Sequence, residues 1–188
     1  MPKSASGPKV YVDTCIYINV IKREPGLWAD SLKVLLAAER GDIRLVASTL
    51  LLAEIGSWNG TVDPISRDQI LSGYLENLPV EWAELDLFTT HEARTLCDRY
   101  RMRGADAVHL ATAIRRKADY LVTRDKGFPT GPVPGTNLQV TPPITLWNPT
   151  LEDAHIDMRA QEESLSLQQR QPSEAPPVPR PQGPARGW

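Results

Sequence analysis

The sequence lacks a long apolar run. None of its 188 residues belongs to a stretch of about 18 consecutive apolar residues, so we expect no transmembrane helix. Cysteine is scarce, and the two cysteines, Cys15 and Cys97, have neither zinc-ligand nor redox-motif spacing. The N-terminus is polar and leads directly into a predicted strand, unlike a signal peptide. Together these features favour a cytoplasmic protein with reduced thiols and no membrane association.

The net charge is −2, and such a small value does not itself indicate a nucleic-acid partner. The distribution of charge is more informative. Between Arg94 and Lys126 there are nine basic residues against four acidic ones, a local excess of five positive charges. This stretch indicates either two solvated helix faces or a surface for an anionic partner such as RNA.

Short apolar segments alternate with helical patterns along the first 150 residues. We expect strands at 9–12, 43–47, 80–85, 120–123 and 138–141. We expect helices at 16–22, 28–40, 50–58, 66–77, 89–102 and 104–117, several of them opened by capping residues. This alternation predicts an α/β fold around a mainly parallel sheet.

The composition changes near residue 150. We expect one folded domain over 1–149, followed by a polar and proline-rich tail over 150–188. A weak polar helix is possible over 152–170, and residues 171–188 contain six prolines. The tail has too few apolar residues to offset the entropy of ordering it, so we expect it to be disordered and dispensable for any chemistry.

Four acidic residues stand where apolar segments begin or end: Asp13, Glu54, Asp106 and Asp125. Each has an ordinary explanation when taken alone, as a strand-end cap, a surface helix position, a partner of the helix dipole or a turn residue. Four uncompensated carboxylates at the edge of one core would nevertheless be costly. Hard oxygen ligands of this kind bind Mg²⁺ or Mn²⁺, so the joint pattern favours a metal site at the carboxyl ends of the strands.

The segments VYVDTCIYI, LLAEI, GADAVHLATA and LVTRDKGF occur in this order between residues 9 and 128. In this the chain resembles PIN-domain proteins, and in particular the VapC-type toxin ribonucleases of bacterial toxin–antitoxin pairs. The resemblance implies a three-layer α/β/α sandwich and a Mg²⁺- or Mn²⁺-dependent endoribonuclease. It places the catalytic, metal-binding acids on Asp13, Glu54, Asp106 and Asp125. It also places supporting hydroxyl groups on Thr14 and Thr123.

The same resemblance implies an RNA substrate and a separate antitoxin partner. Basic side chains of the positive stretch are candidates for guiding the RNA backbone, namely Arg101, Arg103, Arg115, Arg116, Arg124 and Lys126. An antitoxin would need an apolar groove, for which the N-terminal helices offer Ile16, Ile18, Val20, Ile21, Leu27, Trp28 and Trp58. Internal packing of these side chains, or a homodimer, is an almost equal expectation.

Other functions stay open at this point. A catalytically silent PIN module that binds RNA or a protein is the main alternative. A phosphotransferase with a strand-end nucleophile would need a second acid where Cys15 stands. A structure-specific DNA nuclease usually has more acidic ligands and extra helices. For His109 we favour a hydrogen-bonded structural role, and a thiol nucleophile at Cys15 lacks a base.

Overall fold

A six-stranded sheet forms the centre of the fold in the computed structural model, which describes residues 7–57, 72–76 and 78–170. Its strands are β1 (Lys9–Val12), β2 (Arg44–Ser48), β3 (Val80–Ala83), β4 (Tyr120–Val122), β5 (Gly131–Pro132) and β6 (Gln139–Thr141). They lie in the order β3-β2-β1-β4-β6-β5, and all neighbours are parallel except β5 and β6. The mainly parallel sheet expected from the sequence is confirmed, while the short antiparallel strand β5 was not expected.

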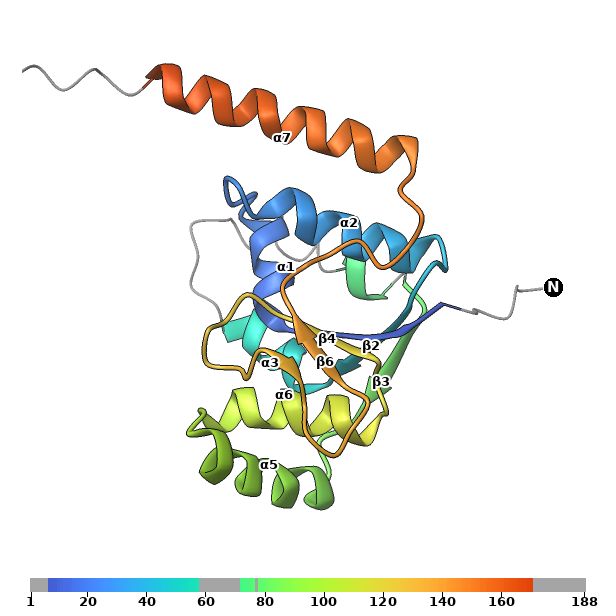
Figure 1. The fold of residues 1–188 in the computed structure, drawn as a ribbon, viewed down its shortest axis with the longest axis vertical. Coiled ribbons are helices and arrows are strands. Elements are labelled where there is room, and N and C mark those ends of the chain that lie inside the picture. Colours follow the sequence, from blue (N-terminus) through green and yellow to red (C-terminus); the bar gives the residue numbers. More distant parts are fainter. Residues whose placement is uncertain (1–6, 58–71, 77, 171–188) are drawn as a thin grey trace, which may run out of the picture.

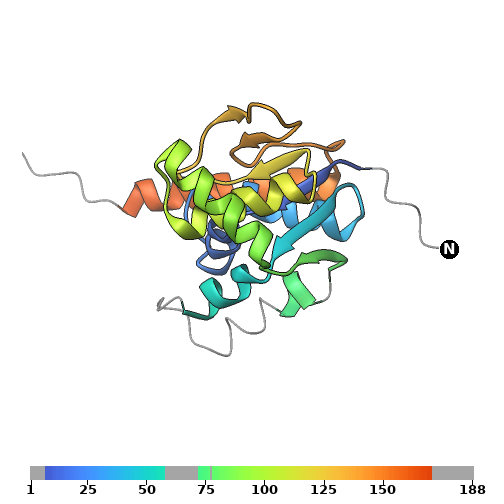
Figure 2. The same cartoon turned by 90° about the horizontal axis from the view of Figure 1, so that it is seen from below.

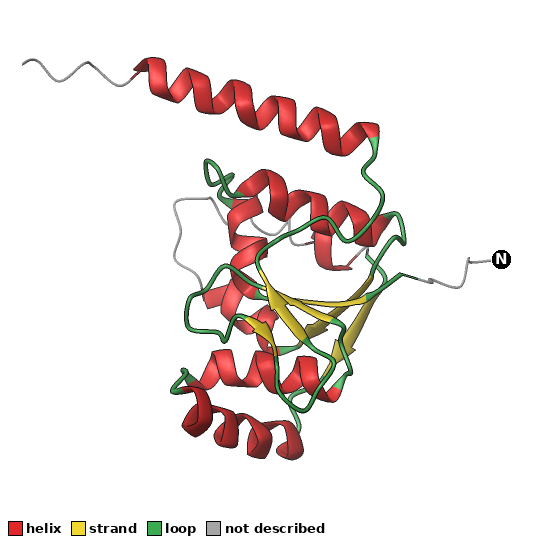
Figure 3. Cartoon of the chain, in the orientation of Figure 1, coloured by secondary structure: helices red, strands yellow, loops and turns green. Residues whose placement is uncertain are grey.

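Helices cover both faces of this sheet (Figures 1, 2 and 3). One face carries α1 (Thr14–Ile21) and α2 (Trp28–Glu39), and the other carries α5 (Leu87–Tyr100) and α6 (Gly104–Arg115). The helix α3 (Leu50–Ser57) follows β2 directly. The three-layer α/β/α sandwich is therefore confirmed. Of the helix predicted over 66–77, the structure describes only η1 (Ser72–Glu76), a turn of π-helix, and the rest lies outside the described residues.

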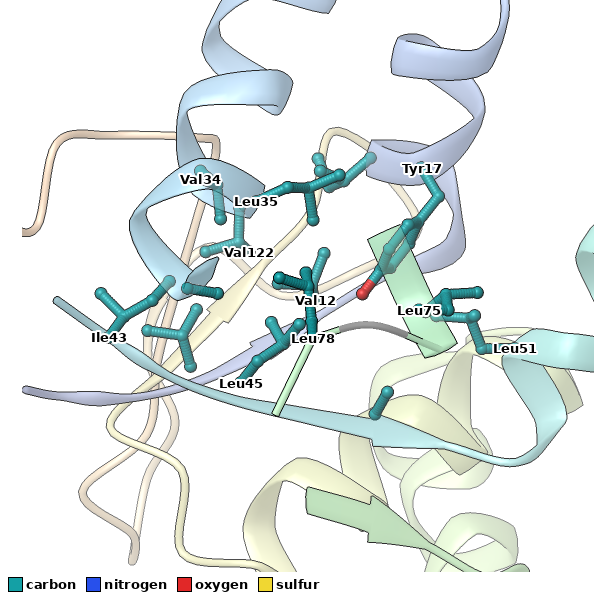
Figure 4. Close-up of a cluster of buried hydrophobic side chains, with 14 of the residues drawn as sticks. Val12, Tyr17, Val34, Leu35, Ile43, Leu45, Leu51, Leu75, Leu78 and Val122 are labelled. Carbon is teal, nitrogen blue, oxygen red and sulfur yellow. The ribbon is translucent and has the colours of Figure 1, made fainter. Parts of the chain in front are cut away.

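The alternation of side chains along β1 explains why the core has two halves. Val10 and Val12 point into a cluster with α1, α2 and α3, whereas Tyr11 points into a second cluster with α5 and α6. Figure 4 shows the first cluster, in which Val12 and Leu45 of the sheet lie beneath Leu35 of α2. A strand buried on both faces reads as a continuous apolar run, as this one does in the sequence.

A long C-terminal helix differs from the expected disordered tail. Leu151–Arg170 forms α7, which lies along the outer side of α2 (Figure 1). Ile156 is only 6% exposed because it packs against Trp28 and Ala29 of α2. The apolar anchors are few, but acidic residues along α7 add ion pairs with α1–α2, and these contacts explain why helix forms where composition suggested disorder. Residues 171–188 lie outside the described residues, and the domain boundary at 149 stays a prediction.

The apolar groove expected on the N-terminal helices is partly filled by the chain itself. Ile16 and Ile21 pack inside the first core cluster, and Trp28 lies beneath α7. Ile18, Val20 and Leu27 are half-buried, and Trp58 lies outside the described residues. Three of the seven side chains are thus buried within the chain and three stay partly exposed, so the use of this surface by an antitoxin stays a prediction.

No helix in the part of the chain that the structure describes is both long enough and apolar enough to cross a bilayer.

Candidate active site

The register of β1 and β4 brings two predicted site segments together. Val12 pairs with Val122, so Asp13 and Thr123 leave adjacent strands at the same edge of the sheet. The Thr123 hydroxyl donates to Oδ2 of Asp13 over 2.7 Å, and the Asp13 backbone N–H donates to the Val122 carbonyl over 3.1 Å. Asp13 also begins α1 as its N-cap, because its Oδ1 accepts from the Thr14 N–H over 2.8 Å. These hydrogen bonds fix the Asp13 side chain, which is only 5% exposed.

Asp106 and Asp125 approach each other beside Gly127. A Cβ atom added to Gly127 would lie 3.2 Å from Oδ1 of Asp125 and 3.3 Å from Oδ2 of Asp106. Asp125 is held by its own loop, since its Oδ1 accepts from the Gly127 N–H over 2.7 Å and its N–H donates to the Thr123 hydroxyl over 3.0 Å. Glycine leaves room at this point for both carboxylates, and any side chain would crowd them.

The three aspartates Asp13, Asp106 and Asp125, hereafter the acid cluster, share one electrostatic environment. Burial, the negative charge of Asp125 and then that of Asp13 raise the pKa of Asp106 above its ordinary value. The charges of His109 and Arg103 act in the opposite direction without cancelling this effect. None of the ion pairs between described residues includes a member of the acid cluster. Negative charge therefore accumulates here without a neutralising partner.

The cluster offers only oxygen atoms, which is the donor chemistry that Mg²⁺ and Mn²⁺ prefer. Among the described residues, however, no group of three or more His, Cys, Asp or Glu side chains is arranged so that it could hold a metal ion as it stands. The residue types thus fit a hard cation, and metal binding by these residues stays a proposal.

Glu54 is held by two donors near the site. Its Oε2 accepts a short hydrogen bond from the Thr14 hydroxyl and lies 2.8 Å from Nε2 of His109. Burial acts to raise the pKa of Glu54, but the hydrogen bonds from His109 and Thr14 outweigh it and lower the pKa below its ordinary value.

Both predicted supporting hydroxyl groups contact the acids. The Thr123 hydroxyl donates to the Asp13 carboxylate and accepts from the Asp125 N–H. Thr14 donates its backbone N–H to the Asp13 carboxylate and its hydroxyl proton to Glu54. The geometry suits residues that orient carboxylates, although this role in binding a ligand stays a prediction.

The predicted RNA-contacting residues separate into two groups in space. Arg101 and Arg103 are exposed in the short connection between α5 and α6, and Arg103 is the N-cap of the helix whose first turn carries Asp106. Lys126 is exposed next to Asp125. Arg124 instead points to α2, where it pairs with Asp30 over 3.1 Å.

Arg115 and Arg116 lie at the opposite end of α6 from Asp106. Nine residues of helix separate Asp106 from Arg115, a rise of about 14 Å. Arg115 pairs with Asp86 over 3.6 Å, and Arg116 pairs with Glu81 over 3.7 Å. Their proximity in sequence to the acid cluster therefore does not make them its neighbours in space, because the helix carries them away from it.

A small pocket adjoins the exposed side of the acid cluster. It has a volume of about 150 Å³ and is lined by Thr123, Arg124, Asp125, Lys126, Phe128, Thr130, Val140, Thr141 and Pro142. Lys126 and three threonines line it beside Asp125, together with the apolar side chains of Phe128, Val140 and Pro142.

Cys15 does not have the environment of a nucleophile. Burial and the neighbouring charge of Asp13 raise the pKa of its thiol to about 12. Its sulfur accepts from the Arg124 N–H over 3.3 Å, which is a structural contact. The thiolate form needed for attack is therefore disfavoured at neutral pH.

The hydrogen-bonded role expected of His109 agrees with its contacts, but sequence reasoning did not identify its partners Tyr11 and Glu54. Tyr11 reads as an ordinary strand residue, and its hydroxyl lies 2.6 Å from Nδ1 of His109. The available signal was the polar ring of His109 three residues after Asp106, on the same helix face.

Comparisons with known proteins agree with this architecture. The family model for the PIN domain matches residues 10–131. A search of curated proteins finds no match. Among solved structures, the VapBC2 complex of Rickettsia felis bound to a promoter DNA fragment contains a chain with 20% identity and a TM-score of 0.51, covering 74% of this chain and 99% of that one.

Two further structures have the same fold. A toxin–antitoxin complex from Klebsiella pneumoniae contains a chain with 20% identity and a TM-score of 0.52, and the match covers 72% of this chain and 98% of that one. A chain in the structure of FitAB bound to a DNA fragment has 16% identity and a TM-score of 0.50, with 75% and 99% coverage. At these identities the likeness establishes the fold alone.

Proposed function

Because the chain belongs to the PIN domain family, we propose that it is a Mg²⁺- or Mn²⁺-dependent endoribonuclease that hydrolyses RNA phosphodiester bonds, and that it is the toxin of a toxin–antitoxin pair. The observation that carries this proposal is the acid cluster. Three carboxylates, from the residue after β1, from α6 and from the loop after β4, lie at one edge of the sheet, and burial together with the charges of Asp125 and Asp13 raises the pKa of Asp106. Uncompensated negative charge of this kind is what a divalent cation requires.

Asp13, Asp106 and Asp125 would hold the cation directly, and Glu54 would assist from its position beside Thr14. When bound, the cation lowers the pKa of a water molecule and neutralises charge on the phosphate. The Thr123 hydroxyl keeps Asp13 in one orientation, and the Asp125 loop is fixed by its hydrogen bonds to Thr123 and Gly127. Arg101, Arg103 and Lys126 are exposed close to these acids and would attract the RNA backbone.

Three solved toxin–antitoxin complexes share this fold, which supports a protein partner of the same kind. Three of the seven apolar side chains first expected to receive an antitoxin are buried within this chain. An antitoxin would therefore bind to the surface that α7 leaves accessible, or displace α7. Co-expression with the product of a neighbouring gene tests this part, and a stable complex that suppresses RNA cleavage is the expected result.

A purified chain incubated with RNA and with DNA tests the activity. We expect RNA cleavage with Mg²⁺ or Mn²⁺, none with EDTA, and none from Asp13→Asn although that variant stays folded. Asp119→Asn, which changes an exposed aspartate remote from the acid cluster, is the matched control and should cleave normally. Cleavage that persists in EDTA or in Asp13→Asn would overturn the proposal.

The alternative of a catalytically silent module also has an observation in its favour. Glu54 already accepts hydrogen bonds from Thr14 and His109, so one of the four proposed ligands is engaged by the protein itself. If wild-type protein binds RNA or a protein with no cleavage under either cation, that alternative replaces the nuclease.

A further inference from the structure

A buried chain of hydrogen bonds ends on Glu54. The Tyr11 hydroxyl lies 2.6 Å from Nδ1 of His109, and Nε2 of His109 lies 2.8 Å from Oε2 of Glu54. The Thr14 hydroxyl donates to the same oxygen. Tyr11 is fully buried and His109 is 1% exposed, so neither side chain can readily exchange its partner for water. The four residues come from β1, α6, α3 and α1, and the chain thus connects four elements around the site.

The position of the shared protons follows from the donors available. The Glu54 carboxylate can only accept, so the proton in its 2.8 Å contact with His109 belongs to Nε2. A Tyr hydroxyl has one proton of its own, and Nδ1 of an imidazole that donates from Nε2 can accept it. The Tyr11 proton is therefore directed at Nδ1 of His109, and the imidazole donates from Nε2 to Glu54.

We propose that His109 is a positioning residue for Glu54: by donating from Nε2 it fixes the Glu54 carboxylate in one orientation. This inference rests on the proposed function, since it assigns Glu54 a place in that same site. Glu54 lies within the short helix α3, and its three side-chain torsions would otherwise sample many orientations. Two donors that converge on one oxygen, Oε2, select a single orientation.

The consequence for chemistry is that the orientation of Glu54 at the site depends on His109. Residues that orient a ligand in this way typically change activity by about 10- to 100-fold.

The simpler reading is that His109 is only a core residue whose polar atoms are satisfied. Two amide substitutions separate the readings. In His109→Gln the side-chain amide nitrogen can occupy the place of Nε2 and still donate to Glu54. In His109→Asn the shorter amide reaches only the place of Nδ1, so the contact to Glu54 is lost. Both variants remove the imidazole and leave comparable space in the core.

Kinetics of RNA cleavage at saturating Mg²⁺ form the first test. We expect kcat of His109→Asn to be at least about tenfold below that of His109→Gln, with similar KM. Thermal unfolding of each variant accompanies the assay. If His109→Asn is too unstable to compare, the pair is repeated in a Glu54→Gln background, where the difference between Asn and Gln should vanish. Equal losses for both variants, or a difference that persists without Glu54, would overturn the proposal.

A spectroscopic test does not depend on cleavage. The sequence has three histidines, so ¹⁵N-histidine labelling of the metal-free protein gives few ring signals, and His91→Asn and His155→Asn assign the other two. We expect His109 to be protonated at Nε2 and unprotonated at Nδ1, and Glu54→Gln to shift its Nε2 signal. A proton on Nδ1, or no response to Glu54→Gln, contradicts the positioning. If the wild-type chain cleaves no RNA with either cation while the spectrum is as expected, the proposed function fails and the positioning of Glu54 stands.

Discussion

Carboxylates lack ion-pair partners in the acid cluster but have them where α7 contacts the N-terminal helices. In the acid cluster no ion pair between described residues reaches Asp13, Asp106 or Asp125, and the pKa of Asp106 is raised. Along α7 the acids meet cations from the segment 23–40: Glu163 meets Arg23, Asp157 meets Lys33, and Glu152 and Asp153 meet Arg40.

The pKa of Asp153 is lowered, the reverse of Asp106. Burial acts to raise it, but hydrogen bonds from Trp147 and Thr150 and the charge of Arg40 outweigh that effect. One region thus keeps charge unmatched at a cost in stability, and the other uses matched charge to attach a helix. The difference separates the acids that stabilise the fold from those that are candidates for binding a cation, although both kinds look alike in the sequence.

The largest expected effect comes from removing one unmatched charge. Asp106→Asn should reduce RNA cleavage by more than about 100-fold, since a proposed ligand charge is lost. The same change should raise the melting temperature in EDTA, because repulsion from Asp13 and Asp125 is relieved. An RNA cleavage assay measures the loss of activity, and calorimetry with and without Mg²⁺ measures the melting temperature. Asp98→Asn on the exposed side of α5 is the control for each measurement. A lower melting temperature in EDTA would contradict the account of the acid cluster.

Removing a matched acid should instead weaken the fold. Asp153 accepts from Trp147 Nε1 over 3.0 Å and from the Thr150 N–H over 2.8 Å. Asp153→Ala leaves these donors without their acceptor and should destabilise α7 by about 1–3 kcal/mol. Amide hydrogen exchange along α7 measures this, with RNA cleavage unchanged as the accompanying expectation. Unaltered exchange would show that the helix is held by Ile156 and its neighbours alone.

The two regions should also respond oppositely to acid. The lowered pKa of Asp153 means that its contribution is complete above the ordinary carboxyl pKa of about 4 and is lost as pH falls through the lower folded value. The raised pKa of Asp106 has the opposite effect on stability, because protonation of that group in acid relieves repulsion in the folded state. Hydrogen exchange as a function of pH should therefore show α7 loosening in acid while α6 near Asp106 does not. If α7 and α6 loosened together, the two carboxylates would not have the opposite effects on stability that we expect.

A smaller effect is expected from the same contrast among basic residues. Arg103 has no ion pair with another described residue, whereas Arg115 is paired with Asp86. Charge reversal at Arg101 and Arg103 should weaken RNA binding by about tenfold and flatten its salt dependence. Reversal at Arg115 and Arg116 should change the salt slope less, because these residues lie at the far end of α6. Equal slopes for the two pairs would show that RNA follows the whole length of that helix.

The smallest effect should follow from an exposed ion pair on α7. The side chains of Arg23 and Glu163 are 51% and 39% exposed, so Glu163→Gln should cost no more than about 1 kcal/mol. Thermal unfolding at low and high salt measures it. A much larger loss would mean that individual surface pairs, and not the packing of Ile156 and Trp28, attach the helix.

Much of the fold could be predicted because strands and helices have different apolar periods. Val10, Tyr11 and Val12 form a continuous apolar run, and a strand buried on both faces requires one. The strand β5 could not be predicted, because Gly131 and Pro132 carry no strand pattern and pair only once β6 is present. For α7 the sequence suggested no more than a weak polar helix over 152–170 within a disordered tail, because its stability comes from partners on α2 that composition does not reveal.

The site was predictable to the extent that it depends on strand ends. Asp13 and Asp125 follow buried strands, so the topology of a parallel sheet places them at one edge. That Glu54 joins the other acids stays a prediction, and the sequence did not reveal that His109 and Thr14 would hold its carboxylate in the folded chain. Arg115 and Arg116 were placed beside the site because they are near in sequence, and the rise of a straight helix separates them from it.

The central place of β1 in the sheet has a consequence for synthesis of the chain on the ribosome. β1 appears first, yet its neighbour on one side is β4, more than a hundred residues later. Thr123, which orients Asp13, and Asp125 both follow β4. A nascent chain that has not yet released this strand therefore has Asp13 without its hydroxyl support and without the third carboxylate. Whatever reaction the site performs, it begins only after almost the whole domain has left the ribosome, so a prematurely terminated product is inert.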